Sequence, residues 1–253
     1  MKKFLFLLFI VVSFGFVGHS QTNSFNYDVN GDGAVTIADV TAIYNYLLIG
    51  NDVHEYVDLA LPSGTLWATT NVGASSPEEY GDYFAWGETQ PKNVYSWSTY
   101  QWCNGSLETL TKYCSISDFG YNGYVDTKTE LDPEDDAATA NWGRAWRMPS
   151  LDQVQELIES CTCQCTTKNG VWGMMFTSNY NGAILFFPAA GMYQNSQVDN
   201  AGSLGLYWER TLTTSGPYGA GNMNFGITRA SVINGSHGRS LGVSVRAVRV
   251  PLN

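Results

Sequence analysis

Basic residues and histidines are scarce in this sequence of 253 residues. It holds 13 Lys and Arg against 23 Asp and Glu, with three His. Two of the lysines, Lys2 and Lys3, precede an apolar segment, and the chain beyond them has 11 basic residues and a net charge of −12. An acidic chain of this kind is repelled by phosphate backbones and by anionic lipid surfaces. We therefore expect neither nucleic acid nor a charged membrane surface as a partner.

Long apolar runs are also missing, since residues 4–14 are too few to cross a bilayer, which takes about 20 residues. The two lysines, this short run and the small residues Gly18 and Ser20 together predict a secretory signal peptide over residues 1–20, cleaved between Ser20 and Gln21. A signal anchor is the alternative. We expect no transmembrane segment in the mature chain and a secreted or cell-surface protein.

Cysteine is sparse as well, with five residues, an odd number. An exported chain can form disulfides, but an odd count leaves at least one thiol unpaired in a monomer. Cys161, Cys163 and Cys165 alternate and should share one face of a strand. Neighbours on such a face lie about 7 Å apart, too far for two ligands of one zinc ion unless the strand bends. We expect buried thiols, and leave open a bridge from one of them to Cys103 or Cys114.

Glycine and aromatic residues are abundant by contrast, with 26 Gly, 8 Trp, 15 Tyr and 12 Phe. Such a composition is typical of an extracellular fold with many loops rather than of a helical enzyme. The predicted mature chain, residues 21–253, is long enough for one medium domain and a small module.

The stretch DVNGDGAVTIAD, residues 28–39, has the spacing of a calcium-binding loop. Oxygen-bearing side chains stand at loop positions 1, 3, 5 and 12, and Gly33 at position 6 allows the sharp turn. Position 7 offers its backbone carbonyl, and position 9 commonly acts through a water. The predicted Ca²⁺ ligands are Asp28, Asn30, Asp32, Ala34, Thr36 and Asp39. A plain turn rich in Asp and Asn is the alternative.

One amphipathic helix follows this loop. Apolar residues recur at helical spacing and predict one apolar face through about Leu48. They are Ile37, Val40, Ile43, Tyr44 and Leu47. No comparable helix precedes the loop, so the module is half of an EF-hand.

Residues 26–49, DVNGDGAVTIADVTAIYNYLL with two residues before it, resemble a dockerin type I repeat. The resemblance implies bound Ca²⁺ and attachment to a cohesin-like or other cell-surface protein, usually in polysaccharide-degrading assemblies. Dockerins normally carry two such repeats and this chain has one. Ile37 and Ala38 also replace hydroxyl residues that cohesin-binding dockerins often have. A calcium-stiffened spacer is the alternative role.

The pattern changes after a polar linker at residues 51–55. Short apolar–polar alternations separated by Gly, Pro and Asn predict strands near Tyr56 and again through the C-terminal part. WRMPSLDQVQELIES contains the clearest helix, with Ser150 as N-cap and Gln153 at capping-box spacing. Its predicted buried residues are Leu151, Val154, Leu157 and Ile158. These elements predict an α+β fold with much irregular structure.

Several blocks of this part, including VDLALPSGTLWATTNVG, FFPAAGM and GRSLGVSVRAVR, resemble the Fibrobacter succinogenes major paralogous domain. The resemblance implies a C-type-lectin-like fold over residues 56–253, in which the first strand, near Val57, pairs with the last, near Val245. The expected organisation is then a signal peptide (1–20), a dockerin-like module (21–50), a linker (51–55) and this domain (56–253).

Catalytic patterns are missing from the expected domain. A Ser-His-Asp site built on His237 would lack a nucleophile elbow. The iron-dependent relatives of this fold need a histidine cluster, and only His54 and His237 lie beyond residue 20. The grouped carboxylates near Asp132 are expected in solvated loops. We therefore expect a protein that is not an enzyme.

A binding role is the main expectation. Aromatic rings stack on sugars while neighbouring polar groups bond the hydroxyls. The candidate ligand-binding residues are Trp86, Trp97, Tyr100, Trp102, Tyr207, Trp208, Glu209 and Asn222. Burial of most of them in the core is the alternative. We expect a secreted, non-catalytic binding or adhesion protein that recognises glycan or a protein partner. A carbohydrate-active enzyme or an accessory subunit of a polysaccharide-degrading system is the alternative, and a structural envelope protein a third.

Overall fold

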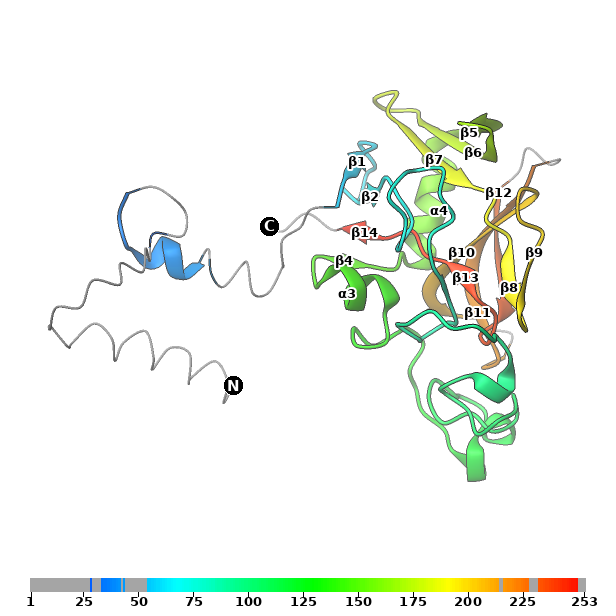
Figure 1. Ribbon diagram of the computed structural model, residues 1–253. Coiled ribbons are helices and arrows are strands. Elements are labelled where there is room, and N and C mark those ends of the chain that lie inside the picture. The colour runs from blue at the N-terminus through cyan, green and yellow to red at the C-terminus, as the bar shows by residue number, and fades with distance from the viewer. Residues whose placement is uncertain are drawn as a thin grey trace, which may run out of the picture. The chain divides into compact units, whose positions relative to one another are not determined.

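The computed structural model describes residues 28, 33–41, 43, 54–213, 216–227 and 232–249. Contacts divide the chain into two units, residues 1–46 and 47–253 (Figure 1). The predicted signal peptide and its cleavage site lie outside the described residues. No helix in the described ranges is long and apolar enough to span a membrane.

The helix of the N-terminal unit begins where the sequence predicts. Residues 37–41 and 43 are helical. Thr36 caps the first turn, because its Oγ1 accepts a hydrogen bond from the N–H of Ala38 at 3.1 Å. In return the carboxylate of Asp39 accepts the N–H of Thr36 at 2.6 Å. These two side-chain hydrogen bonds fix the loop to the helix that follows it.

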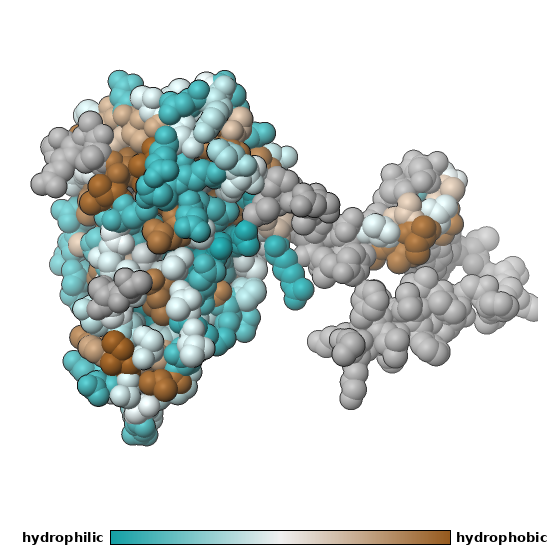
Figure 2. Space-filling model, turned by 180° about the vertical axis from the view of Figure 1, so that it is seen from behind, coloured by the Kyte–Doolittle hydropathy of each residue, from teal (hydrophilic) through white to brown (hydrophobic). Residues whose placement is uncertain are grey.

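Two residues of the predicted apolar face of this helix are exposed. Ile37 is 79% exposed and Val40 is 37% exposed. Figure 2 shows hydrophobic residues at the surface of the N-terminal unit. Tyr44 and Leu47 lie outside the described residues.

The larger unit is mostly β-sheet with few helices, as the α+β prediction requires (Figure 1). The first sheet has the order β1 (Tyr56–Asp58), β2 (Leu66–Ala68), β14 (Val248–Arg249) and β4 (Trp146–Arg147). The second has the order β12 (Val232–Gly238), β11 (Gly219–Gly226), β10 (Leu204–Leu212), β13 (Val243–Ser244) and β3 (Tyr83–Phe84). The third joins β5 (Cys161–Lys168), β6 (Val171–Ser178) and β7 (Ile184–Pro188), and the fourth β8 (Met192–Gln194) and β9 (Gln197–Asp199). The helices are α3 (Ala137–Trp142), α4 (Leu151–Ser160) and the 3₁₀ turns Trp97–Thr99, Ser117–Phe119 and Tyr121–Gly123.

The expected pairing of the first strand with the last is wrong in detail. β1 pairs antiparallel with β2, with Val57 opposite Trp67. β14 pairs with the other edge of β2, with Val248 opposite Trp67. Val245 accepts the N–H of Val72 at 2.9 Å instead. The two ends of the domain thus meet through β2, which lies between them.

The helix α4 begins as predicted. Ser150 accepts the N–H of Gln153 at 3.2 Å and the Gln153 side chain accepts the N–H of Ser150 at 3.0 Å. Val154 and Leu157 are buried, but Leu151 is 44% exposed and was wrongly assigned to the buried face. The first residue of the helix projects past the edge of the packed surface.

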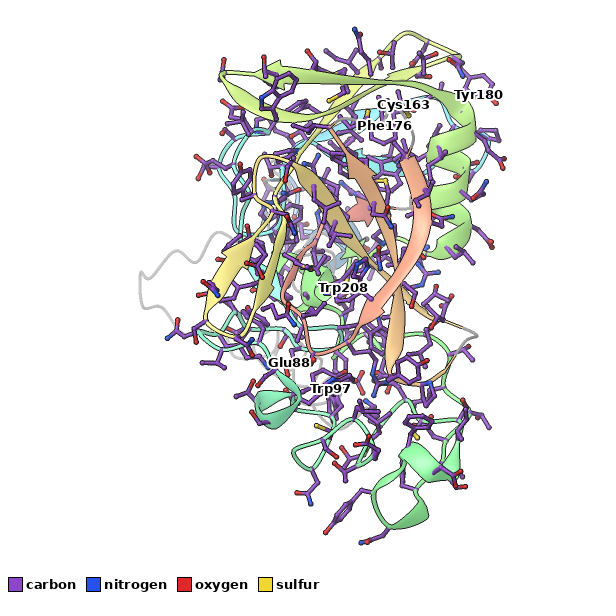
Figure 3. The ribbon with its side chains drawn as sticks, turned by 90° about the vertical axis from the view of Figure 1, so that its right-hand side faces the viewer. Glu88, Trp97, Cys163, Phe176, Tyr180 and Trp208 are labelled. Carbon is purple, nitrogen blue, oxygen red and sulfur yellow. The ribbon has the colours of Figure 1, made fainter. Side chains whose placement is uncertain are left out.

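One core lies between α4, the three-stranded sheet and one face of the five-stranded sheet. Its largest buried members are Trp67, Phe176, Phe187 and Tyr207. Figure 3 shows Cys163 beside Phe176 under the three-stranded sheet. A second core, which includes Trp86 and Trp208, lies around β10, β13 and α3.

The long segment between β3 and α3 has few regular elements and a core of its own. Tyr95, Tyr100, Leu110 and Cys114 are buried in it. Arg239, fully buried, reaches in from the end of β12 and donates to the carbonyl oxygen of Tyr113 at 2.9 Å. This packing decides which aromatic residues of the segment remain available to a ligand.

Candidate functional site

The described part of the predicted calcium loop has the turn that such a loop needs. The carboxylate of Asp28 accepts the N–H of Gly33 at 2.8 Å. Gly33 has φ +88°, a left-handed conformation that a residue without a β-carbon adopts at no steric cost. The first loop position is thus bonded to the sixth.

The last loop position is also held. Asp39 is 2% exposed, and its carboxylate is fixed by the N–H of Thr36. Asn30 and Asp32 lie outside the described residues, and among the described ones no three His, Cys, Asp or Glu side chains converge. The donors at the two ends of the loop are oxygens, which suit a hard cation such as Ca²⁺. The residues present fit that ion.

Four of the candidate aromatic residues cannot offer a ring to a sugar, because they are core residues. Trp86 and Trp208 are fully buried, and Tyr100 and Tyr207 are 3% and 2% exposed. Their polar tips bond to backbone: Trp86 Nε1 donates to Glu209 O and Trp208 Nε1 to Phe84 O, both at 2.8 Å. Tyr100 and Tyr207 donate to the carbonyls of Trp86 and Pro188. Each ring fills the interior and each donor is already used.

Trp97 and Trp102 are partly exposed, but they do not form a flat platform. Trp102 donates its Nε1 to Gly87 O at 2.7 Å, and the ammonium of Lys112 lies 4.8 Å from its ring centroid. Trp97 meets the ring of Tyr100 edge-on at 5.5 Å. Figure 3 places Trp97 in the loops, well away from Trp208. The eight candidates therefore do not come together at one surface.

The two polar candidates are interior residues. Glu209 is 1% exposed, and neither of its carboxylate oxygens has a hydrogen-bond partner. Burial raises the pKa of Glu209 from 4.5 to about 7. Asn222 is fully buried, with its Nδ2 3.1 Å from Nδ1 of His237. Burial also lowers the pKa of His237. Both side chains, on β10 and β11 of the five-stranded sheet, are therefore enclosed in the interior.

The predicted shared face of the three alternating cysteines is confirmed, but no disulfide forms among the five cysteines. Cys161, Cys163 and Cys165 lie opposite Ser178, Phe176 and Met174, all toward one core, which confirms their shared face. All five cysteines are free, so no bridge to Cys103 or Cys114 forms. Burial raises the pKa of Cys161 and of Cys163 to about 11, which keeps both as thiols.

Sequence reasoning missed a cavity of about 750 Å³ in the larger unit. Its wall includes three arginines, Arg144, Arg147 and Arg210, together with Glu134 and Thr139. The one sequence signal was the stretch GRAWR, residues 143–147, which places two arginines close together in a chain with few basic residues. Arg210 joins them only through the fold.

Residues 21–61 match the dockerin type I domain family. The match confirms the dockerin resemblance, and it runs beyond residue 49, through the predicted linker and β1. No curated protein and no solved structure matches the chain. The C-type-lectin-like assignment of residues 56–253 stays a prediction.

Proposed function

We propose that the chain is an exported attachment protein, in which a calcium-binding dockerin module fastens a non-catalytic recognition domain to a cohesin-like receptor. The observation that carries the proposal is the geometry of the loop within the dockerin match. The two ends of the loop, Asp28 and Asp39, are fixed by the N–H groups of Gly33 and Thr36. Ca²⁺ held there would be bound by the oxygens of Asp28, Asn30, Asp32, Ala34, Thr36 and Asp39. It would supply positive charge that closes the loop around it.

The described surface of the N-terminal unit supports a docking role. Val35 and Ile37 are 68% and 79% exposed, and Val40 joins them on the first turn of the helix. Exposed apolar side chains beside a polar loop are typical of protein interaction sites. A receptor that covers them would gain hydrophobic free energy at the position where calcium orders the chain.

The larger unit supports recognition rather than catalysis. Burial raises the pKa of two carboxyl groups, Glu209 and Asp136, and Glu209 is enclosed in the interior and does not line the cavity. An acid-base residue must reach the proton that it transfers. The carboxylates that line the cavity wall include Asp136, whose two oxygens accept the N–H groups of Thr139 and Met148. That carboxylate has a structural role in capping α3.

The proposal is tested by binding the full-length protein to an immobilised type I cohesin module. We expect binding in millimolar Ca²⁺ and its loss in chelator. Asp28→Ala should abolish binding, while Asp118→Ala, which replaces an exposed acid of the larger unit, should bind like the wild type. Binding that survives chelator and Asp28→Ala alike would reject calcium-dependent attachment. Turnover of a polysaccharide by the same purified protein would instead favour the carbohydrate-active enzyme.

A further inference from the structure

The arginine-lined cavity is assembled from the stretch of residues 130–147 and from Arg210 of β10, more than sixty residues further along the chain. Residues 130–136 form one wall, the turn from α3 into β4 carries Arg144 and Arg147, and β10 carries Arg210. Glu130 bridges antiparallel to Thr211, and the N–H of Leu131 donates to Arg210 O at 3.0 Å, so the first wall is bonded to β10.

The same walls are tied to each other through α3. The Thr139 hydroxyl donates to Trp146 O at 2.8 Å, and Asp136 bonds both Thr139 and Met148. The cavity is therefore a preformed feature of a hydrogen-bonded frame, which lowers the entropic cost of filling it.

Two of the three arginines there have no partner. The guanidinium groups of Arg144 and Arg147 make no ion pair or hydrogen bond with a residue in the described ranges. Arg210, in contrast, donates to Glu130 at 3.0 Å. The remaining described arginines serve elsewhere: Arg239 and Arg246 are fully buried, and Arg249 lies 5.6 Å from the ring centroid of Tyr56.

The acids of the cavity balance these two cations only in part. Glu130 is paired with Arg210, and Asp136 accepts backbone N–H groups with both oxygens. Partial desolvation, and then the neighbouring charge of Arg210, lower the pKa of Arg147, whereas Asp136 and Glu130 act to raise it. The third acid of the wall, Glu134, makes no ion pair with a described residue, so two unpaired arginines and one unpaired carboxylate line the cavity. An anion that binds between the two arginines would complete this balance of charge.

The anion is a group on a small molecule rather than an extended peptide. β4 is an edge strand, but its backbone is already bonded: Trp146 N donates to Gly143 O at 3.0 Å, and Met148 N donates to Asp136. A peptide that adds to a sheet edge needs those groups free. The volume of about 750 Å³ suits a ligand the size of a short saccharide.

We propose that this cavity binds an acidic saccharide, with Arg144 and Arg147 holding the carboxylate of a uronate residue. A guanidinium matches a carboxylate with two parallel hydrogen bonds, which gives orientation as well as affinity. The Glu134 carboxylate and the Thr139 hydroxyl, on the same wall, supply acceptors for sugar hydroxyls. The inference rests on the recognition half of the proposed function and names its ligand class.

The test is calorimetric titration of the full-length protein with trigalacturonate, and with its methyl ester as the neutral match. We expect binding of the acid form and at least about tenfold weaker binding of the ester, since hydrogen bonds to a charged group are worth more than 1.4 kcal/mol. Arg144→Gln and Arg147→Gln should each weaken binding by a similar factor. Both side chains are exposed, so the variants should fold, which circular dichroism verifies.

Lys168→Gln, on β5 and outside the cavity, is the matched control and should bind like the wild type. Failure of trigalacturonate to bind, or equal binding by the ester or by both arginine variants, would overturn the proposal. Tighter binding of hexaglutamate than of trigalacturonate would show that the cavity prefers an acidic peptide. That result would also overturn the proposal. Calcium uptake and cohesin binding depend on the N-terminal loop and are measured in separate experiments. A failure of the saccharide proposal can therefore be distinguished from a failure of calcium-dependent attachment.

Discussion

The carboxylate of Glu209 lies over Gly221 of the neighbouring strand, in the space that a side chain would fill. A β-carbon at Gly221 would stand 2.5 Å from Oε2 of Glu209 and 3.2 Å from the carbonyl oxygen of Thr211. The register of β10 on β11 shifts between Trp208 and Leu212, so Glu209 sits in the irregular part of the pairing. A buried acid is thus accommodated by the absence of one side chain opposite it.

Gly221→Ala is expected to destabilise the larger unit by roughly 1–3 kcal/mol, because the added methyl group must displace the Glu209 carboxylate or the strand. Urea unfolding followed by fluorescence measures the change. Gly226→Ala, on the same strand, is the control, since its β-carbon would meet nothing closer than 4.0 Å. Equal effects of the two substitutions would show that the Glu209 contact does not matter.

Glu209 should make stability depend on pH. Its pKa is about 7 in the fold against an ordinary 4.5, so the folded state binds the proton more tightly than the unfolded state. Its contribution is complete below about pH 4.5 and is lost as pH rises through 7, at a cost of roughly 3 kcal/mol. The glutamine of Glu209→Gln does not titrate. The stability of this variant relative to the wild type should therefore be higher at pH 8 than at pH 4.5.

Denaturant midpoints of wild type, Glu209→Gln and the control Glu108→Gln, measured between pH 4.5 and 8, test this expectation. Glu108 is exposed, and its substitution should leave the pH profile unchanged. If Glu209→Gln follows the wild-type profile throughout, the carboxylate is paired or solvated in solution.

Ser150→Ala is expected to cost about 1 kcal/mol, because it removes the acceptor for the N–H of Gln153 and half of the capping box. Thermal unfolding by circular dichroism measures the loss. Ser75→Ala, an exposed serine in a loop, serves as the control. An unchanged melting temperature for Ser150→Ala would mean that packing alone holds the start of α4.

Local features could be predicted from the sequence because their partners lie a few residues away. The Ser150–Gln153 cap and the alternation of Cys161, Cys163 and Cys165 are of this kind. The burial of the aromatic residues, in contrast, depends on residues far away in the sequence. Trp86 and Trp208 are buried because their ring N–H groups meet carbonyls more than one hundred positions away. Periodicity contains no information on such contacts.

The cavity shows the same limit. Arg144 and Arg147 are close in sequence, but Arg210 reaches them only because β10 is bonded to the segment around Leu131. The calcium loop is the opposite case, since all six predicted ligands fall within twelve consecutive residues. The spacing alone was therefore enough to predict its ligands. The described ends of the loop add the hydrogen bonds that hold its turn.

All five thiols are expected to be free and slow to react in the native protein. Cys161 and Cys163, with pKa values of about 11, are almost entirely protonated at pH 8, and the thiolate is the reactive form. Reaction with a chromogenic disulfide should be slow in buffer and should reach five thiols per chain in denaturant. Three or fewer thiols in denaturant, without reductant, would reveal a disulfide.

Calorimetric Ca²⁺ titration of the full-length protein tests the central claim most directly. The account predicts one ion bound per chain, loss of that binding in Asp28→Ala, and normal binding in Asp152→Ala, an exposed acid on α4. Calcium uptake that is the same in Asp28→Ala as in the wild type would contradict the account.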